Sequence, residues 1–346
     1  MTEKLESVNT QGEQVAIETT HCNEIHLEGK IILITGASSG TGLSTAETAS
    51  QQGARVSIGT RNEDNFARAI KNITTPDNIS MFQADISQPD QVIHALDTMG
   101  SMPDVIIHSA ATGMDFMPDF LRRLVSITNA RIKDRPFNGA LERLKSQIPD
   151  WIKASKDSSW AVNYYGSLAF IQTIKERKTD NSPLLFINYT SLSSSVIALR
   201  MAAGLNVNQA HSTPISLEDT AHIPDFYENI AGSKGALEYT LKQKASELSS
   251  KGINIVTLSS SVILDTIVGK ILKKHLLPLV RSNAQRQIIE DSFIDRKDMV
   301  RTALELAAEH PSNWVDPFRT VYILKKGQVV DELPLSHDVL KLDIPL

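Results

Sequence analysis

The sequence predicts an α/β fold in which helices cover both faces of a mostly parallel β-sheet. Short apolar runs alternate with helix-like stretches, the runs are rich in β-branched residues, and a glycine-rich turn follows the first run. Short runs of this kind suit strands that are buried on both faces of a parallel sheet. Their alternation with helices predicts a doubly wound order of strands.

The alternation begins at Lys30 and continues almost to the end of the chain. We expect strands at 31–34, 55–58, 79–83, 105–107, 184–187, 253–258 and 320–324. We expect helices at 42–52, 63–72, 88–98, 159–176, 228–250 and 297–309. Gly53 follows the first of these helices, in the position where a glycine commonly ends a helix.

Two long segments interrupt an otherwise single domain that spans 29–330. The first covers about 112–157 and contains an amphipathic helical stripe, and the second covers about 195–225. Both follow the carboxyl ends of predicted strands, where ligands bind in open α/β sheets, so we interpret them as covers of an active site; decoration or an oligomer contact is the alternative. Residues 1–28 are polar and aperiodic, which predicts a surface or partly disordered extension, and 331–346 form a C-terminal tail.

Composition argues against several classes of protein. The chain has 346 residues, of which 41% are hydrophobic, and its net charge of −5 argues against nucleic acid as a partner. Its single cysteine, Cys22, cannot form an internal disulfide, and the nine histidines lack the spacing of metal ligands. The first residues lack the pattern of a signal peptide, and no apolar run is long enough to cross a bilayer. We therefore expect a cytoplasmic protein that binds neither a membrane nor a metal.

The residues after the first strand form the most informative motif. The run Thr35-Gly36-Ala37-Ser38-Ser39-Gly40-Thr41-Gly42 lies between a predicted strand and a predicted helix. Glycines permit a tight turn there and let backbone N–H groups at the helix start approach a pyrophosphate, whose charge the helix dipole favours. In this context the glycines predict a dinucleotide site rather than a purely structural turn.

The segment from Leu27 through Gly42 closely resembles the opening of the short-chain dehydrogenase/reductase family. The family's order of elements can be followed along roughly 30–324. The resemblance implies a Rossmann-type fold, a nicotinamide cofactor and an oxidoreductase activity. It also implies a homo-oligomer, a dimer or tetramer, formed through the helices at 159–176 and 228–250.

Positions on the second and third strands bear on the choice of cofactor. An NAD enzyme usually has an acid at the end of its second strand to hold the ribose 2′-OH, whereas this chain has Arg61 there. Arginine suits a 2′-phosphate, so we expect NADPH in preference to NADH; a solvated surface arginine is the alternative. By resemblance Asp85, followed by Ile86, would bind the adenine, although Asp85 or Ser87 could also cap a helix.

Two segments near the nicotinamide end depart from the family. Where the family has an Asn-Asn-Ala-Gly turn, this chain has His108-Ser109-Ala110-Ala111, in which Ala110 matches, so backbone contacts to the cofactor are expected there. Where the family has Pro-Gly and then a threonine that touches the carboxamide, this chain has Ser261-Val262, and Thr266 aligns with the threonine.

By resemblance the catalytic groups are an acid, a lysine that holds the ribose and favours the ionised acid, a serine that orients the substrate oxygen and an asparagine in a proton relay. Asn163, Ser191 and Lys234 match the last three by order and context. The family's tyrosine would fall on Ile230, which cannot donate a proton. Tyr227 is the next tyrosine upstream, and Tyr-x6-Lys is the spacing of the divergent enoyl-acyl-carrier-protein reductases.

Two functions are compatible with these residues. The first is an NADPH-dependent oxidoreductase that reduces a carbonyl or an activated enoyl group of a small organic or acyl-thioester substrate, with Tyr227 as the acid. A loop aromatic is the alternative for Tyr227, and Tyr165 and Tyr189 are weaker candidates for the acid because neither has a lysine at helical spacing. The second function is a non-redox or catalytically altered member of the fold, serving as a nucleotide-binding scaffold, a regulator or a biosynthetic enzyme, as Ile230 and the altered turn suggest.

Overall fold

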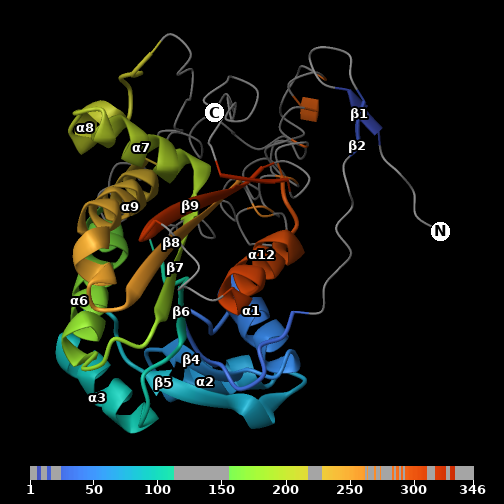
Figure 1. Ribbon diagram of the computed structural model, residues 1–346, viewed down its shortest axis with the longest axis vertical. Coiled ribbons are helices and arrows are strands. Elements are labelled where there is room, and N and C mark those ends of the chain that lie inside the picture. The colour runs from blue at the N-terminus through green and yellow to red at the C-terminus, as the bar shows by residue number, and fades with distance from the viewer. Residues whose placement is uncertain are drawn as a thin grey trace, which may run out of the picture.

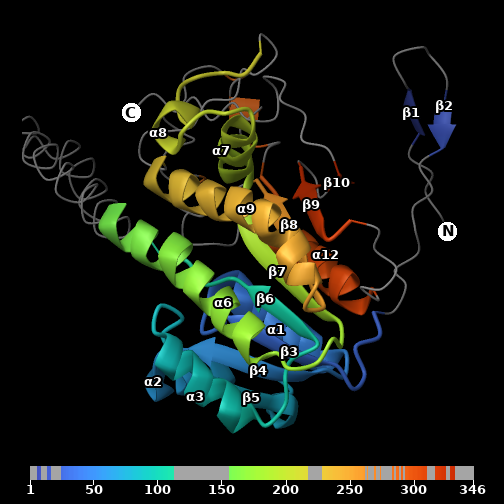
Figure 2. The ribbon, with the colours of Figure 1, turned by 60° about the vertical axis from the view of Figure 1, so that its left-hand side comes forward.

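The computed structural model describes residues 25–112, 156–216, 228–261, 293–309, 316–324 and 328–331, isolated residues between 263 and 290, and the backbone of two short N-terminal strands. Within these residues the chain forms a sheet of eight strands in the order β10-β9-β8-β7-β6-β3-β4-β5. Helices cover both faces of this sheet (Figure 1, Figure 2). The predicted α/β fold class is confirmed.

The main strands are those that the sequence predicts, and several extend further at the carboxyl end. They are β3 (Ile31–Thr35), β4 (Arg55–Thr60), β5 (Ile79–Gln83), β6 (Val105–His108), β7 (Leu184–Ser191), β8 (Ile253–Ser260) and β9 (Phe318–Ile323). All neighbours among these seven strands are parallel. A short edge strand, β10 (Val329–Val330), pairs antiparallel with β9 and was not predicted.

The strand order creates a switch point between β3 and β6. From β3 the chain continues to β4 and β5 on one side, and from β6 it continues to β7, β8 and β9 on the other. The last residues of the two central strands, Thr35 and His108, are register partners. Ligands of open α/β sheets bind outside the carboxyl ends of the strands at such a point. The fold therefore brings the glycine turn and the turn after β6 to the place where a ligand is expected.

Two helical layers enclose the core. One face packs against α1 (Gly40–Gln51), α2 (Glu63–Ile70) and α12 (Arg296–Ala308). The other face packs against α3 (Pro89–Met99), α6 (Ser167–Arg177) and α9 (Glu228–Ser249). Gly53, with a φ of 87°, follows the C-cap of α1, as its sequence position predicts.

The second predicted insertion starts as helix rather than loop. After β7 come α7 (Leu192–Ala202) and α8 (Val207–Ala210). A Cβ on Gly235 of α9 would lie 2.5 Å from the carbonyl oxygen of Ser194 and 2.6 Å from Cβ of Ile197. The glycine therefore lets α7 lie directly on α9, which keeps the start of α7 at the carboxyl end of β7.

Other predictions were wrong or lie beyond the described residues. The N-terminal extension contains two short antiparallel strands, β1 (Glu6–Val8) and β2 (Gln14–Ala16), where the sequence predicts no regular structure. Most of the first insertion lies outside the described residues. Among the helices that are described, none combines the length and apolar character that a bilayer crossing requires.

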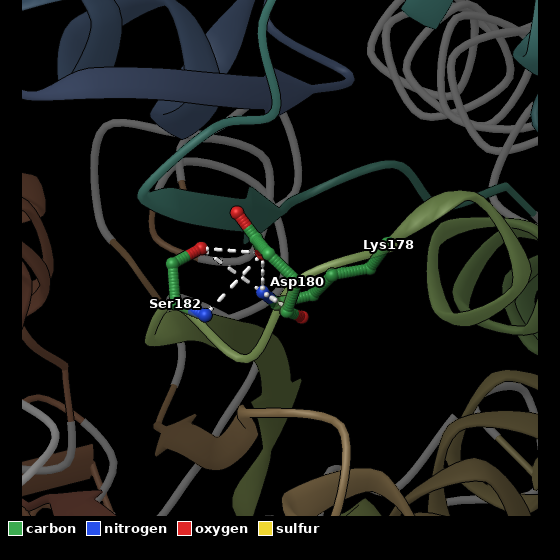
Figure 3. Close-up of polar contacts among 3 residues, drawn as sticks. All are labelled: Lys178, Asp180 and Ser182. Atoms are coloured by element: carbon green, nitrogen blue, oxygen red, sulfur yellow. Dashed lines mark hydrogen bonds and ion pairs between the residues drawn. The ribbon is translucent and has the colours of Figure 1, made fainter.

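At the amino ends of the strands, opposite the predicted site, the buried Lys178 holds the connection between α6 and β7 (Figure 3). Nζ of Lys178 donates to the backbone oxygen of Asp180 at 3.0 Å, to its carboxylate at 2.6 Å and to Oγ of Ser182 at 3.0 Å. The hydrogen bond from Lys178 lowers the pKa of the Asp180 carboxyl to about 2. This cluster fixes the amino end of β7, whereas the predicted site lies at the carboxyl ends.

Candidate active site

The glycine turn joins β3 to α1 through conformations that favour glycine. Gly36 and Gly40 have φ values of 67° and 62°. A Cβ on Gly36 would lie 2.6 Å from Cα of Ala110, so the glycine turn is in backbone contact with the turn after β6. Ser39 is the N-cap of α1, but its side chain makes no capping hydrogen bond. The first N–H groups of α1 are thus not capped by this side chain and suit an anion.

The surface of this turn is accessible to solvent at the carboxyl ends of the strands. Ser39 is exposed, and Ser38 and Thr41 are half-buried. Gly42 is buried because it lies beneath the turn, where a Cβ would be 2.7 Å from the oxygen of Gly36. The predicted glycine-motif residues therefore form one continuous element at the switch point.

Arg61 lies directly after β4 and is exposed. The next residue, Asn62, caps α2 by accepting a hydrogen bond from the backbone N–H of Asn65 at 3.0 Å. Because β3 and β4 are parallel neighbours, Arg61 is at the same edge of the sheet as the glycine turn. This placement is compatible with both interpretations of Arg61 from the sequence.

Asp85 is held in a local turn after β5. Its Oδ1 accepts from the backbone N–H of Ser87 at 2.9 Å and from the hydroxyl of Ser87 at 2.6 Å. The N-cap of α3 is Gln88, so the alternative prediction that Asp85 or Ser87 caps this helix was wrong. The adjacent Ile86 is buried and anchors the turn to the core.

Asn163 lies in a π-helix, η2 (Trp160–Gly166), which precedes α6 where the sequence predicts one uninterrupted α-helix. Its Oδ1 accepts from the N–H of Thr112 at 2.9 Å, and its Nδ2 donates to the oxygen of Thr112 at 3.0 Å. Nδ2 also donates to Oγ of Ser233 at 3.2 Å. Asn163 thus connects the turn after β6 to the helix that carries Lys234, and π-helical turns frequently occur at functional sites.

Lys234 extends from α9 to the carboxyl end of β7. Its Nζ donates to the backbone oxygen of Tyr189 at 3.0 Å, two positions before Ser191. Burial lowers the pKa of Lys234 to about 8. Its charge also contributes to a lowered pKa of His108 at the end of β6. The structure therefore brings Lys234, the end of β7 and the end of β6 into one electrostatic environment.

Ser191 is both the last residue of β7 and the N-cap of α7. Its Oγ accepts from the backbone N–H of Ser194 at 3.3 Å and shares a hydrogen bond with Oγ of Ser194 at 2.8 Å. The start of α7 therefore orients this hydroxyl, and the helix dipole favours negative charge beside it. The sequence analysis missed Ser194, although the spacing Ser-x-x-Ser is a recognisable sign of a helix cap.

The two weaker candidates for the acid, Tyr189 and Tyr165, are both poorly placed for this role. The hydroxyl of Tyr189 is directed toward α1, where it lies 3.1 Å from Oγ1 of Thr45, and burial raises its pKa. Tyr165 is 63% exposed and packs beside Trp160 and Tyr164. Ile230 is buried, with 5% of its surface exposed. Tyr227 and Thr266 lie outside the described residues, so their predicted roles stay predictions.

Comparison with known proteins shows a similarity over the first part of the described sheet. A family model described as short chain dehydrogenase matches residues 30–132, which include the glycine turn and the turn after β6. The match covers the part of the site in which the predicted cofactor-binding residues are most numerous.

Among curated proteins, the chain is similar to a 3-dehydrosphinganine reductase of Arabidopsis thaliana. The two are 36% identical over 87 residues, which are 25% of this chain and 27% of the reductase. Retinol dehydrogenase 11 of Mus musculus is 22% identical over 173 residues, which are 49% of this chain and 46% of that protein. The chain thus spans between about a quarter and half of the length of these relatives.

Several solved structures share the fold over most of the chain. A 7α-hydroxysteroid dehydrogenase complexed with NADH and 7-oxo glycochenodeoxycholic acid has a TM-score of 0.55 at 18% identity, covering 90% of this chain and 98% of that one. The Pseudomonas aeruginosa RhlG/NADP active-site complex has a TM-score of 0.57 at 16% identity, covering 88% and 97%. At these identities the likeness shows the fold alone.

Proposed function

We propose that this chain is a short-chain dehydrogenase/reductase, namely an NADPH-dependent oxidoreductase that reduces a carbonyl or an activated enoyl group of a small organic or acyl-thioester substrate. The observation that carries the proposal is the backbone contact between Gly36 and Ala110 at the switch point of the sheet. This contact leaves no room for a side chain and presents the start of α1 to a ligand. A dinucleotide pyrophosphate fits this surface, because it needs backbone N–H groups and a helix N-terminus.

Arg61 supports NADPH in preference to NADH. It follows β4 at the edge that carries the glycine turn, in the position where an NAD enzyme usually has an acid. A guanidinium group there suits the additional phosphate of NADPH through charge-assisted hydrogen bonds. Related structures have been determined with NADH and with NADP, so the preference rests on Arg61 itself.

The bound nicotinamide cofactor would supply the hydride, and the residues of this chain would orient the substrate and provide the proton. Ser191 would donate its hydroxyl hydrogen to the substrate oxygen, while the start of α7 favours the negative charge that develops there. The ammonium group of Lys234 would favour the ionised form of the acid, which we assign to Tyr227. Asn163 would hold the turn after β6 in place through its two bonds to Thr112.

The most direct test of the catalytic assignment is Tyr227→Phe, with Tyr189→Phe as the matched control. We expect Tyr227→Phe to lower turnover by about 100-fold or more while NADPH affinity is retained, because it removes only the proton donor. Tyr189→Phe removes a buried hydroxyl bonded to Thr45, so it should lower stability and leave turnover largely unchanged.

Wild-type turnover by Tyr227→Phe would contradict the assignment of the acid. A wild-type protein that binds no nicotinamide cofactor would favour the second function, a non-redox member of the fold. The observation in favour of that alternative is Ile230, which is buried in the position of the family's tyrosine.

We also propose that the protein forms a homodimer through α6 and α9. A groove between these helices is lined by the apolar residues Leu168, Ala169, Ile171 and Leu248 and, at its rim, by Gln172, Lys244 and Glu247. The exposed Tyr165 lies at the preceding turn. A second copy of the same two helices would cover this groove. Light scattering on purified protein at micromolar concentration should give twice the chain mass, and a monomer would contradict the proposal.

A further inference from the structure

His108 replaces the first asparagine of the family's Asn-Asn-Ala-Gly turn and is one of the most buried polar residues, with 2% of its surface exposed. Its ring packs against the neighbouring rings of Phe170 and Phe186, with centroid distances of 5.7 Å and 5.6 Å. Each ring nitrogen contacts a hydroxyl group: Nδ1 lies 2.9 Å from Oγ1 of Thr35, and Nε2 lies 2.7 Å from Oγ of Ser167. The ring is thus held by two aromatic neighbours and at both nitrogens.

The neighbouring hydrogen bonds determine which nitrogen carries the proton. The hydroxyl of Ser167 donates its single hydrogen to the backbone oxygen of Val162 at 3.1 Å, so its Oγ must accept from Nε2–H of His108. Oγ1 of Thr35 accepts from the backbone N–H of Ala110 at 3.4 Å, which leaves its own hydrogen for Nδ1. His108 is therefore the neutral Nε2–H tautomer.

The neutral state of His108 is stable over the physiological range of pH. Burial lowers the pKa of the imidazole to about 3, and the nearby charge of Lys234 contributes to the same shift. A ring with this environment does not exchange protons with a substrate. Its role must lie in the contacts that it makes.

These bonds form one directional chain between two parts of the site. It runs from the N–H of Ala110 through Thr35 and His108 to Ser167 and the oxygen of Val162. Thr35 immediately precedes the first glycine of the glycine turn, and Val162 immediately precedes Asn163 in the π-helix. His108 contacts both the strand of the glycine turn, through Thr35, and the start of α6, through Ser167.

We propose that His108 is a positioning residue that holds the turn 109–112 and Asn163 in register with the glycine turn. Asn163 depends on this register because its side chain pairs with both backbone groups of Thr112. A turn that shifts relative to Gly36 would move the backbone of Ala110 out of contact with a bound cofactor. The effect on the cofactor rests on the proposed function, whereas the effect on Asn163 does not.

Three substitutions separate the contacts of His108. His108→Phe keeps the aromatic stacking and removes both hydrogen bonds, His108→Asn places an acceptor near Nδ1, and His108→Gln places a donor near Nε2. The matched control is His94→Gln, because His94 is exposed on α3. All variants are compared at a temperature at which thermal melting shows them to be folded.

We expect His108→Phe to raise the dissociation constant of NADPH by about tenfold or more, because two buried bonds that fix the turn are lost. His108→Asn and His108→Gln should each restore part of the affinity, and His94→Gln should leave it unchanged. A folded His108→Phe protein with wild-type affinity for NADPH would overturn the effect on the cofactor.

Two measurements without cofactor test the same inference if a variant fails to fold or the protein binds no NADPH. Nitrogen-15 spectra of histidine-labelled wild-type protein should show the neutral Nε2–H tautomer for His108 between about pH 5.5 and 8. Ser167→Ala, which removes the acceptor of the Nε2–H bond, should make the amide of Thr112 exchange with solvent about tenfold faster. An Nδ1–H tautomer, or unchanged exchange at Thr112, would overturn the positioning role. The expected tautomer and exchange in a protein that binds no NADPH would uphold it and reject the proposed function alone.

Discussion

The two halves of the sheet build their parts of the site in different ways. In the half formed by β3 to β6, backbone geometry dominates: Gly36 allows the glycine turn to touch Ala110, and Gly42 lies beneath it. In the half formed by β7 to β9, polar side chains dominate, among them the half-buried Lys234 and the buried Glu238 of α9. Close backbone approach requires glycine at fixed spacing, whereas a side-chain cluster can be assembled from many residue types. The family model matches 30–132, which includes the first of these halves.

A buried carboxyl group is the clearest example in the second half. Ser195 of α7 donates to Oε2 of Glu238 at 2.8 Å, and its Oγ lies 2.9 Å from Oγ of Ser259 in β8. Burial raises the pKa of Glu238 to about 7, although Ser195, Lys242 and Thr320 each favour the ionised form. One turn of α9 after Lys234, the chain thus keeps a group that titrates near neutral pH.

In the first half, the largest loss of cofactor affinity is expected when a single methyl group is added at Gly36. Gly36→Ala should lower NADPH affinity by about 100-fold or more, because the positive φ and the contact with Ala110 both exclude a Cβ. Calorimetric titration of the folded variant measures this. Gly100→Ala is the matched control, because Gly100 has a φ of 70° and nothing within 4 Å of an added Cβ.

Gly100→Ala should cost about 1 kcal/mol of stability through backbone strain and leave cofactor affinity unchanged. Equal losses of affinity in the two variants would mean that backbone strain, and not the contact between the two turns, accounts for the effect. The proposed ligand-binding role of that contact would then be wrong.

The sequence predicts the first half well because its determinants are local. Gly36, Gly40 and Gly42 stand between a strand and a helix, and each of them has the backbone role that its spacing implies. The exception is Asp85, where a turn within two residues competes with helix capping, and the sequence does not distinguish the two. The π-helix at Asn163 was also missed, because its geometry depends on contacts with Thr112 and Ser233.

A second, smaller effect is expected on the pH dependence of stability. Glu238→Gln tests whether the core of the second half contains a buried carboxyl group that ionises near neutral pH. The native pKa of about 7 lies above the ordinary value of 4.5, so the native state binds more protons than the unfolded state between these limits. The free energy of unfolding should therefore contain a contribution that falls as the pH rises from about 4.5 to about 7 and is constant above.

Glu238→Gln should remove that contribution, so the variant should gain stability relative to wild type across the same pH range. Urea unfolding at several pH values measures the difference, and Glu305→Gln on the exposed face of α12 is the control. A difference between Glu238→Gln and wild type that does not vary with pH would contradict a buried, protonated Glu238.

The smallest effect on cofactor binding is expected at the amino ends of the strands, where Lys178 has no proposed role in the site. Lys178→Met should cost about 1–3 kcal/mol, because Asp180 and Ser182 lose their buried partner. NADPH affinity should not change. Lys244→Met is the control on an exposed ion pair with Glu247 and should cost less than about 1 kcal/mol. A loss of NADPH affinity in Lys178→Met would show that the amino ends of the strands are energetically coupled to the site at their carboxyl ends.

The second half could be predicted from sequence only in part, for a physical reason. Asn163, Ser191 and Lys234 could be placed by order along the chain, and the last two approach each other through the backbone of Tyr189. The partner of Ser191, Ser194, is only three residues away and has a local sign that was missed. The partner of His108 at the end of β6 could not be predicted, because Ser167 acquires its role from how the start of α6 packs. Packing between elements far apart in sequence leaves no periodic signal.

The central claim is that the glycine turn and Arg61 form a site for NADPH, and titration of the purified protein with NADPH and NADH tests it most directly. We expect NADPH to bind about tenfold or more tightly than NADH, since a charge-assisted pair with the 2′-phosphate is worth more than about 1.4 kcal/mol. Arg61→Ala should abolish that difference and leave NADH affinity unchanged. Binding of neither cofactor to the folded wild-type protein would contradict the account.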